Sequence, residues 1–545
     1  MGAASHKGCL CLVLHAHLPY IRHPEHEFFL EENWLYEAIT ETYIPLLDVF
    51  SRLIDDGVDF RVTLSLSPVL LEMLNDGLLR ERYERHIERL IGLSEREVFR
   101  TRRDTDLKPV TKMYHESFLK IRRLFTDVCK RDLVRAFRML QETGKIGIIP
   151  TAATHAFLPH LSLYPQAVNA QLRTGIEHYR TNFGRSPKGI WLPECGFAPG
   201  FDGFIKEKGV EFFFLETHGI MQARPAPRYG VYAPLTCPSG VAAFGRDEET
   251  SGQVWSSIHG YPGDYYYRDF YRDIGFDLDL DYVKAHIKPY GAETYTGLKY
   301  YRITGKTGRK EPYNIQKAEE RAAEHARHFI NSREMQINRL SDTLKIEPVV
   351  TAVYDAELFG HWWFEGTQWL DKLLRGIYLS KVNFRTVNPS EYLRGLTFRK
   401  EGLQSGDPAM SSWGENGYGE VWLNRENDYI YRHLLVATER MIRLADRFPV
   451  ADGVLQRALN QAAREVLLSQ HSDWAFIMKG KTASQYAKKR FEEHIGRFTF
   501  LYRSVLSDNV SETVLADMED RDRIFREIDY RVFSRRQPAS EGRQL

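Results

Sequence analysis

Short apolar runs alternate with long amphipathic stretches through the first two-thirds of this 545-residue chain. Polar, glycine or proline residues follow each run. The alternation is typical of parallel strands joined by helical crossovers, and it predicts an α/β barrel. The runs lie at residues 9–14, 60–66, 146–151, 189–192, 210–215 and 348–354, with a further one near 384–387.

Other segments interrupt or follow these runs. Residues 78–143 and 315–344 are charged and amphipathic, which predicts a helical insertion and a further helix. Residues 244–309 are aromatic and turn-rich, which predicts a long functional loop. After Asn424, apolar residues recur at three- and four-residue spacing in 429–448, 454–469 and 483–507, as expected for a helical bundle.

We therefore expect three parts along the chain. Residues 1–400 would form the catalytic barrel, with an aromatic loop region over about 220–309. Residues 401–533 would form a C-terminal helical domain that completes the cleft. Residues 534–545 lack apolar content and are expected to be disordered.

Composition excludes several classes of protein. With 27% charged residues and a net charge of +1, the chain lacks the strongly basic field that nucleic-acid binding favours. Its five cysteines form no framework spacing and no CxxC pair, which favours reduced thiols. The sequence shows neither a secretory signal nor an 18-residue apolar run, so we expect a cytoplasmic protein with no membrane partner.

Polar side chains follow several of the predicted strands, at the end where barrel active sites lie. The first strand is followed by His15 and His17, the third by Thr154 and His155, the fourth by Glu194, the fifth by Glu216 and His218, and the late strand by Asp355 and Glu357. Acidic side chains, Glu194 and Asp355 among them, and several imidazoles are thus expected to converge at one mouth of the barrel.

Glycosidic cleavage needs one carboxylic acid to protonate the leaving oxygen and a second carboxylate to attack the anomeric carbon or to activate water. Glu194 and Asp355 suit these roles, because each follows an apolar run and has aromatic neighbours that exclude water. A separation of roughly 5 Å would fit a retaining mechanism and a larger one an inverting mechanism. Taken alone, each acid is more often a helix cap or an ion-pair member.

These motifs resemble those of glycoside hydrolase family 57, and most closely its 1,4-α-glucan branching enzymes. The resemblance spans nearly the whole chain. The motifs read His-Ala-His-Leu-Pro at 15–19, Thr-His-Ala-Phe-Leu-Pro at 154–159, Trp-Leu-Pro-Glu-Cys-Gly at 191–196, Tyr-Asp-Ala-Glu-Leu-Phe-Gly-His-Trp-Trp at 354–363, and a tryptophan-containing segment at 413–422.

The resemblance implies a distorted seven-stranded (β/α) barrel followed by a helical domain. It implies that Glu194 is the nucleophile of a retaining mechanism, that Asp355 is the general acid/base, that the partner is an α-glucan, and that neither metal nor cofactor takes part. The implied substrate-binding residues are His15, His17, Trp34, His155, Tyr261, Arg268, Trp362, Trp413, Trp422 and Asp473.

Transfer of a glucan chain requires that water be kept from the covalent intermediate. An aromatic loop over residues 261–267 is our candidate for a closing lid, with Tyr261 as the ring that covers the sugar and Tyr232 as a competitor.

Several alternatives stay open. The same carboxylates would serve an α-amylase or a 4-α-glucanotransferase. A metal-dependent deacetylase or α-mannosidase would instead use His15 and His17 as zinc ligands. Trp413 and Trp422 are equally compatible with core packing, and a non-catalytic glycan-binding protein would keep the aromatic residues alone. Oligomeric state is left open.

Overall fold

A computed structural model of the chain describes residues 6–256, 259–287, 295–305, 307–399, 403–480 and 482–536. The chain forms two compact units, each assembled from separated stretches of sequence. Unit 1 comprises residues 1–64, 73–148 and 246–402, and unit 2 comprises residues 65–72, 149–245 and 403–545.

Unit 1 is organised around a five-stranded sheet in the order β3-β2-β1-β8, with β9 also paired to β1. The strands are β1 (Gly8–Ala16), β2 (Val62–Leu66), β3 (Ile146–Ile149), β8 (Val349–Asp355) and β9 (Phe384–Thr386). All nine residues of β1 are buried, and β1 runs parallel to both β8 and β9. Its register pairs His15 with Asp355, so polar residues at the carboxyl ends of both strands are neighbours.

Some helices of unit 1, among them α4 and α13, begin at side chains that cap their first turn. Asp76 accepts the backbone N–H of Leu79, and Asn314 accepts that of Lys317, which satisfies amide groups left free at a helix start. The helices are α1 (Glu32–Ala38), the π-helical turn η1 (Ile39–Tyr43), α2 (Ile44–Asp55), α4 (Gly77–Arg100), α5 (Lys108–Arg123), η2 (Leu124–Val128), α6 (Leu133–Glu142), α13 (Ile315–Leu344), α14 (Gly366–Leu379) and α15 (Pro389–Arg399). The residues of helix α3 (Pro68–Asn75) are divided between the two units, with 68–72 in unit 2 and 73–75 in unit 1.

Unit 2 contains the second five-stranded sheet, in the order β10-β6-β7-β5-β4. The strands are β4 (Gly189–Ile190), β5 (Phe212–Leu215), β6 (Leu235–Thr236), β7 (Ala242–Gly245) and β10 (Gln404–Ser405). Strands β6 and β7 are antiparallel, and the other pairs are parallel. A Cβ atom at Gly189 would lie 2.2 Å from the ring of Phe212, so this strand pair requires a glycine.

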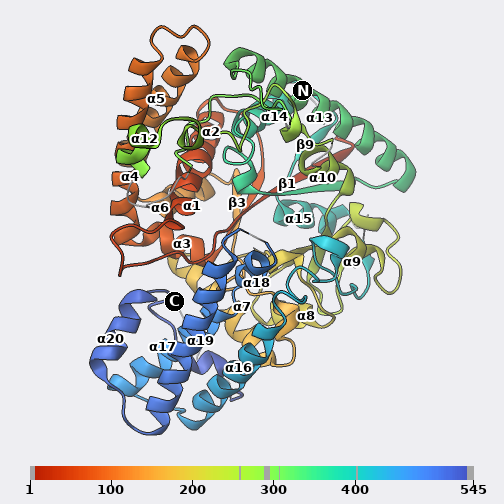
Figure 1. The fold of residues 1–545 in the computed structure, drawn as a ribbon. Coiled ribbons are helices and arrows are strands. Elements are labelled where there is room, and N and C mark those ends of the chain that lie inside the picture. The colour runs from red at the N-terminus through yellow and green to blue at the C-terminus, as the bar shows by residue number, and fades with distance from the viewer. Residues whose placement is uncertain are drawn as a thin grey trace. The chain divides into compact units, whose positions relative to one another are not determined.

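The helices of unit 2 include the C-terminal group, drawn in shades of blue in Figure 1. Helix α17 packs against α16, α19 and α20. The helices are α7 (Pro165–Phe183), α8 (Phe201–Glu207), α9 (Thr217–Met221), α16 (Tyr429–Arg447), α17 (Gly453–Ser469), α18 (Ser472–Lys479), α19 (Ser484–Leu506) and α20 (Glu512–Arg521), with a final turn η10 (Tyr530–Phe533).

The structure confirms most of the predicted elements. All seven apolar runs contain strands, and the helix predicted over 315–344 has those bounds. The α/β class followed by C-terminal helices is therefore observed. The described strands pair into two separate sheets rather than one continuous sheet, so closure into a seven-stranded barrel stays a prediction, as do the domain boundaries near residue 400.

One prediction is wrong in part, because residues 244–309 are not a single loop. They contain the helices α10 (Glu248–Trp255), α11 (Ile274–Asp277) and α12 (Leu280–Ile287). Two of these helices begin at aspartates, Asp247 and Asp273, whose carboxylates accept backbone N–H groups of the first turn. The parts of this region at 257–258, 288–294 and 306 lie outside the described residues, as does the predicted tail from residue 537 onward.

None of the helices in the described ranges has the length and apolar character that crossing a membrane requires.

Candidate functional site

Glu194 lies in unit 2, on a tight turn (Pro193–Cys195) directly after β4. Its φ is 63° and that of Cys195 is 52°, and nearby His155 has φ of 54°. Left-handed backbone at a non-glycine residue costs of order 1–3 kcal/mol, and such residues gather at functional sites. The turn is held in place because the Trp413 N–H donates to the Glu194 carbonyl at 2.9 Å.

The Glu194 carboxylate accepts a side-chain hydrogen bond on each oxygen. Ser472 Oγ donates to Oε1 at 2.8 Å, and Trp413 Nε1 donates to Oε2 at 2.6 Å. Glu194 is only 8% exposed. Because an ionised carboxylate accepts hydrogen bonds and donates none, both donors match the charged form that a nucleophile requires.

His155 extends this arrangement through Ser472. Its Nδ1 lies 3.0 Å from Ser472 Oγ and 3.6 Å from Glu194 Oε1. The Ser472 proton is donated to Glu194, so His155 donates from Nδ1 to the serine oxygen. The Ser472 N–H in turn donates to the His155 carbonyl at 3.2 Å. A chain of three polar groups thereby fixes the orientation of Glu194.

The other residues predicted for the unit 2 site differ in exposure. Trp422 is 1% exposed and stacks on Phe157 with centroids 4.8 Å apart, so it packs as a core residue. Trp413 and Asp473 are partly exposed. The Asp473 carboxylate lies 3.2 Å from Nδ1 of His471, at the start of α18.

In unit 1, Asp355 is the last residue of β8 and is partly exposed. Glu357 follows on the turn η8 (Ala356–Leu358) and is buried. Its Oε1 accepts from the Tyr43 hydroxyl at 2.5 Å and from the His17 N–H at 3.2 Å. Burial, with a further contribution from the charge of Asp355, raises the pKa of Glu357 to about 8.

The histidines of the first motif lie at the end of β1. His15 is 2% exposed, while His17 is partly exposed, and their rings lie 6.0 Å apart with an interplanar angle of 21°. Trp34 lies on α1 and is also partly exposed.

Trp362 is the exposed aromatic residue of the fourth motif. It is 52% exposed, and one face stacks on Phe270 with centroids 4.3 Å apart. The preceding His361 is anchored, because its Nδ1 lies 2.6 Å from Glu41 Oε2. Burial alone would raise the pKa of Glu41, but the charge of Arg268 and the His361 hydrogen bond lower it to about 2.

Arg268, which the sequence predicts as a glucan contact, is buried and bonded to other protein groups. It is 3% exposed, and its guanidinium bonds the Tyr114 hydroxyl at 3.2 Å and the His361 carbonyl at 3.0 Å. An ion pair with Glu41 at 3.4 Å completes its surroundings. Arg268 therefore supports the segment that carries Trp362 from behind.

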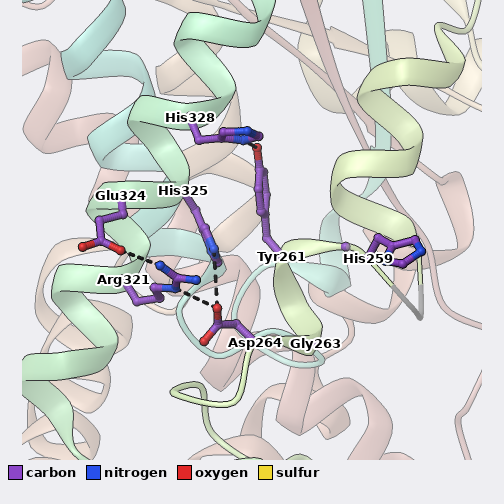
Figure 2. A pocket seen from close by; sticks show the side chains of 9 residues that line it. His259, Tyr261, Gly263, Asp264, Arg321, Glu324, His325 and His328 are labelled. Carbon is purple, nitrogen blue, oxygen red and sulfur yellow. Dashed lines mark hydrogen bonds and ion pairs between the residues drawn. The ribbon is translucent and has the colours of Figure 1, made fainter.

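Tyr261 is also more enclosed than expected of a lid. It is 7% exposed, its hydroxyl lies 2.7 Å from His328 Nδ1, and its ring stacks on His325 at 4.5 Å. Figure 2 shows these contacts beside a pocket of about 460 Å³ that Asp264 and Arg321 also line. A contact between Tyr261 and sugar would require this packing to open, so the lid role stays a prediction.

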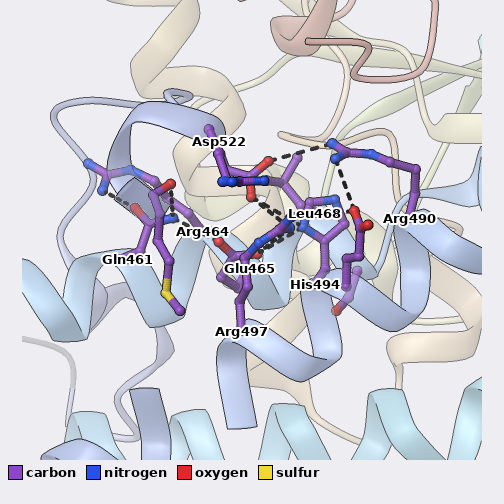
Figure 3. A network of polar contacts seen from close by, with 12 residues as sticks. Gln461, Arg464, Glu465, Leu468, Arg490, His494, Arg497 and Asp522 are labelled. Atoms are coloured by element: carbon purple, nitrogen blue, oxygen red, sulfur yellow. Dashed lines mark hydrogen bonds and ion pairs between the residues drawn. The ribbon is translucent and has the colours of Figure 1, made fainter. Parts of the chain in front are cut away.

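One buried group of side chains in unit 2 has atoms close enough to hold a metal ion. Glu465, His494 and Asp522 bring their ligand atoms within 4.8 Å of one another. Figure 3 shows that the arginines Arg490 and Arg497 already pair with Asp522. A cation would have to displace these guanidinium groups, so the cluster is better described as an internal ion-pair network.

Two supporting side chains of the site carried no signal in the sequence. Ser472 is a single hydroxyl next to a predicted residue, and Tyr43 lies far from any of the motifs. The structure groups Glu194 with His155 and Trp413 in unit 2, and Asp355 with His15 and Glu357 in unit 1. Because the two acids belong to different units, the prediction from their separation is not tested.

Comparison with known proteins agrees with the motifs. The profile described as glycosyl hydrolase family 57 matches residues 11–405, and that described as 1,4-alpha-glucan branching enzyme, C-terminal, matches residues 433–533. A 1,4-alpha-glucan branching enzyme of Thermococcus kodakarensis is 34% identical over 96% of this chain and 78% of its own length.

Two solved structures resemble the chain over nearly its full length. The alpha-amylase AmyC of Thermotoga maritima is 46% identical with a TM-score of 0.90, covering 97% of this chain and 100% of its own. A GH57-type branching enzyme of Pyrococcus horikoshii is 34% identical with a TM-score of 0.87, covering 98% of both chains.

Proposed function

The chain belongs to glycosyl hydrolase family 57, and from this premise we infer that it is a 1,4-α-glucan branching enzyme. The observation that carries this inference is the C-terminal helical region, because residues 433–533 match the C-terminal domain of branching enzymes. The substrate is an α-glucan. The enzyme cleaves an α-1,4 linkage and transfers the released chain to a glucan 6-hydroxyl, which forms an α-1,6 branch.

The reaction proceeds in two displacements. Glu194 attacks the anomeric carbon while Asp355 protonates the leaving glucosidic oxygen, which leaves a covalent glycosyl-enzyme. Asp355 then takes the proton of the acceptor 6-hydroxyl, and that oxygen displaces Glu194. Configuration at the anomeric carbon is retained because it is inverted twice.

The surroundings of Glu194 support its assignment as the nucleophile. Hydrogen bonds from Ser472 and Trp413 fix both carboxylate oxygens, and the left-handed turn holds the side chain on a short, rigid connection to β4. A nucleophile held in one orientation reacts without first losing conformational entropy.

The surroundings of Asp355 support a proton-transfer role. It stands at the carboxyl end of a buried strand, is partly exposed and has the buried acid Glu357 two residues away. Paired carboxyl groups of unequal burial are a common source of distinct acid and base roles.

Sugar binding is assigned to the partly exposed residues of the predicted set. Trp362 and Trp413 offer aromatic surface for a pyranose ring, and His17, Trp34 and Asp473 offer further polar or aromatic contacts. The buried residues His15, His155, Arg268 and Trp422 support these from within.

A second candidate is an α-amylase, because the AmyC structure at 46% identity carries that description. Hydrolysis would use the same two carboxylates, with water replacing the acceptor hydroxyl. Incubation with amylose, followed by debranching and chain-length analysis, separates the two activities. We expect new α-1,6 linkages, and shortened chains without any such linkage would refute branching.

A cytoplasmic location is supported by the cysteines. All five are buried and none of them forms a disulfide, which suits a reducing compartment.

A further inference from the structure

Two acidic residues stand two positions apart on the segment that leaves β8. Asp355 ends the strand and is partly exposed, whereas Glu357, two residues later, is 8% exposed. Two like charges at such a site repel each other, and burial adds the cost of removing water from the inner one. Ionising both acids together is therefore unfavourable.

Two donors from other parts of the chain hold the Glu357 carboxyl in place. The Tyr43 hydroxyl and the His17 N–H both donate to Oε1, at 2.5 and 3.2 Å. Both donors are uncharged groups, so neither neutralises an ionised carboxylate at this buried position.

Turn η1 and strand β1, which pack against this turn, and strand β8, which leads into it, contain neither lysine nor arginine. Turn η1 contributes Glu41, which is engaged with His361 and Arg268, and Tyr43. Strand β1 contributes His15, followed by His17, and β8 contributes Tyr354 and Asp355. Within the described part of the chain, no lysine or arginine pairs with Glu357. Burial first, and the Asp355 charge next, thus raise its pKa to about 8.

We propose that Asp355 and Glu357 act as a coupled pair that carries one proton at neutral pH, with Glu357 as a positioning residue that retains this proton for Asp355. The proposal rests on the assignment of Asp355 as the general acid/base. Asp355 gives the proton of the pair to the leaving glucosidic oxygen as the glucosidic bond breaks and the bond to Glu194 forms. Asp355 then takes the proton of the acceptor hydroxyl as that oxygen displaces Glu194, so the pair again holds one proton at the end of the cycle.

Coupling predicts that the pH dependence of kcat/KM belongs to the pair rather than to either acid. Glu357→Gln removes the second carboxyl, so Asp355 alone must hold the proton and loses it more easily. The alkaline limb of the profile should then move to lower pH by at least about one unit.

Tyr43→Phe acts in the opposite direction. The Tyr43 hydrogen bond stabilises the ionised form of Glu357 and so lowers its pKa. Its removal should leave the pair holding the proton to higher pH, and the alkaline limb should move upward. Damage to the fold alone would not shift the limb in opposite directions in the two variants.

The test measures initial rates on amylose from pH 4 to 10 for the full-length wild type, Glu357→Gln and Tyr43→Phe. Tyr354→Phe is the matched control, because it removes a buried hydroxyl that donates to the Thr250 carbonyl at 3.0 Å. Thermal unfolding checks that each variant is folded.

We expect opposite shifts for Glu357→Gln and Tyr43→Phe and none for Tyr354→Phe. Profiles that superimpose on the wild type, or shifts in the same direction, would overturn the coupling. If Glu357→Gln has no measurable rate, the shift in Tyr43→Phe decides. Asp355→Asn separates the two claims. Full activity in that variant would refute the acid/base assignment itself. Loss of activity in Asp355→Asn, together with unshifted alkaline limbs in Glu357→Gln and Tyr43→Phe, would refute only the coupled pair.

Discussion

Replacing Ser472 by alanine removes one of the two side-chain hydrogen bonds to Glu194. The lost bond is 2.8 Å long and charge-assisted, and Ser472 itself is only 2% exposed. Hydrogen bonds to charged groups contribute about 1.5–3 kcal/mol. At about 1.4 kcal/mol for each factor of ten, this predicts a fall in kcat of roughly 10- to 100-fold. KM should change little, because Ser472 is not among the proposed glucan contacts.

The assay follows the loss of the amylose–iodine complex under saturating substrate. Ser469→Ala is the matched control, because this serine is equally buried and its Oγ donates only to the Val466 carbonyl, at 2.7 Å. We expect the control to keep the wild-type kcat. A Ser472→Ala enzyme within twofold of wild type would show that this hydrogen bond does not position the nucleophile, and the reasoning would be refuted.

Three further predictions concern residues of unit 1. Arg268→Met should lower the free energy of unfolding by roughly 3–5 kcal/mol, since it removes the arginine that pairs with the largely buried Glu41; the exposed pair Arg85–Glu81 gives the control, where Arg85→Met should cost about 1 kcal/mol or less in urea titrations. The pKa of Glu357 is higher in the folded protein than its ordinary 4.5, so its contribution to stability is present below about pH 4.5 and is lost as pH rises towards 8. The wild type should therefore lose up to about 5 kcal/mol relative to Glu357→Gln over that window, and a constant difference in unfolding free energy would contradict the shift. Trp362→Ala should raise KM for amylose several-fold with little change in kcat, and an unchanged KM would remove this ring from the glucan contacts.

The elements that were predictable share a strong local pattern. Strands β1 and β8 are continuous apolar runs. Helix α13 has a charged amphipathic pattern, and the helix begins and ends where that pattern does. Strands β6, β7 and β10 have only two to four residues each, and so few residues do not establish a period.

The acids of the site were predictable because their motifs are distinctive, but their supporting residues were not. Ser472 and Tyr43 reach Glu194 and Glu357 from sequence positions 278 and 314 residues away. Arg268 shows a different limit of the sequence. The motif places this arginine near the site, but only the packing of the folded chain decides whether its guanidinium contacts sugar or protein. Burial is a property of the assembled fold and has no local sequence signal.

The central claim is that Glu194 forms the covalent intermediate. Its most direct test is mass spectrometry of the enzyme after reaction with a fluorinated glucosyl donor that forms the intermediate quickly and releases it slowly. We predict one glucosyl adduct, located by peptide fragmentation on Glu194, and no adduct in Glu194→Gln. An adduct on another side chain, or full branching activity in Glu194→Gln, would contradict the account.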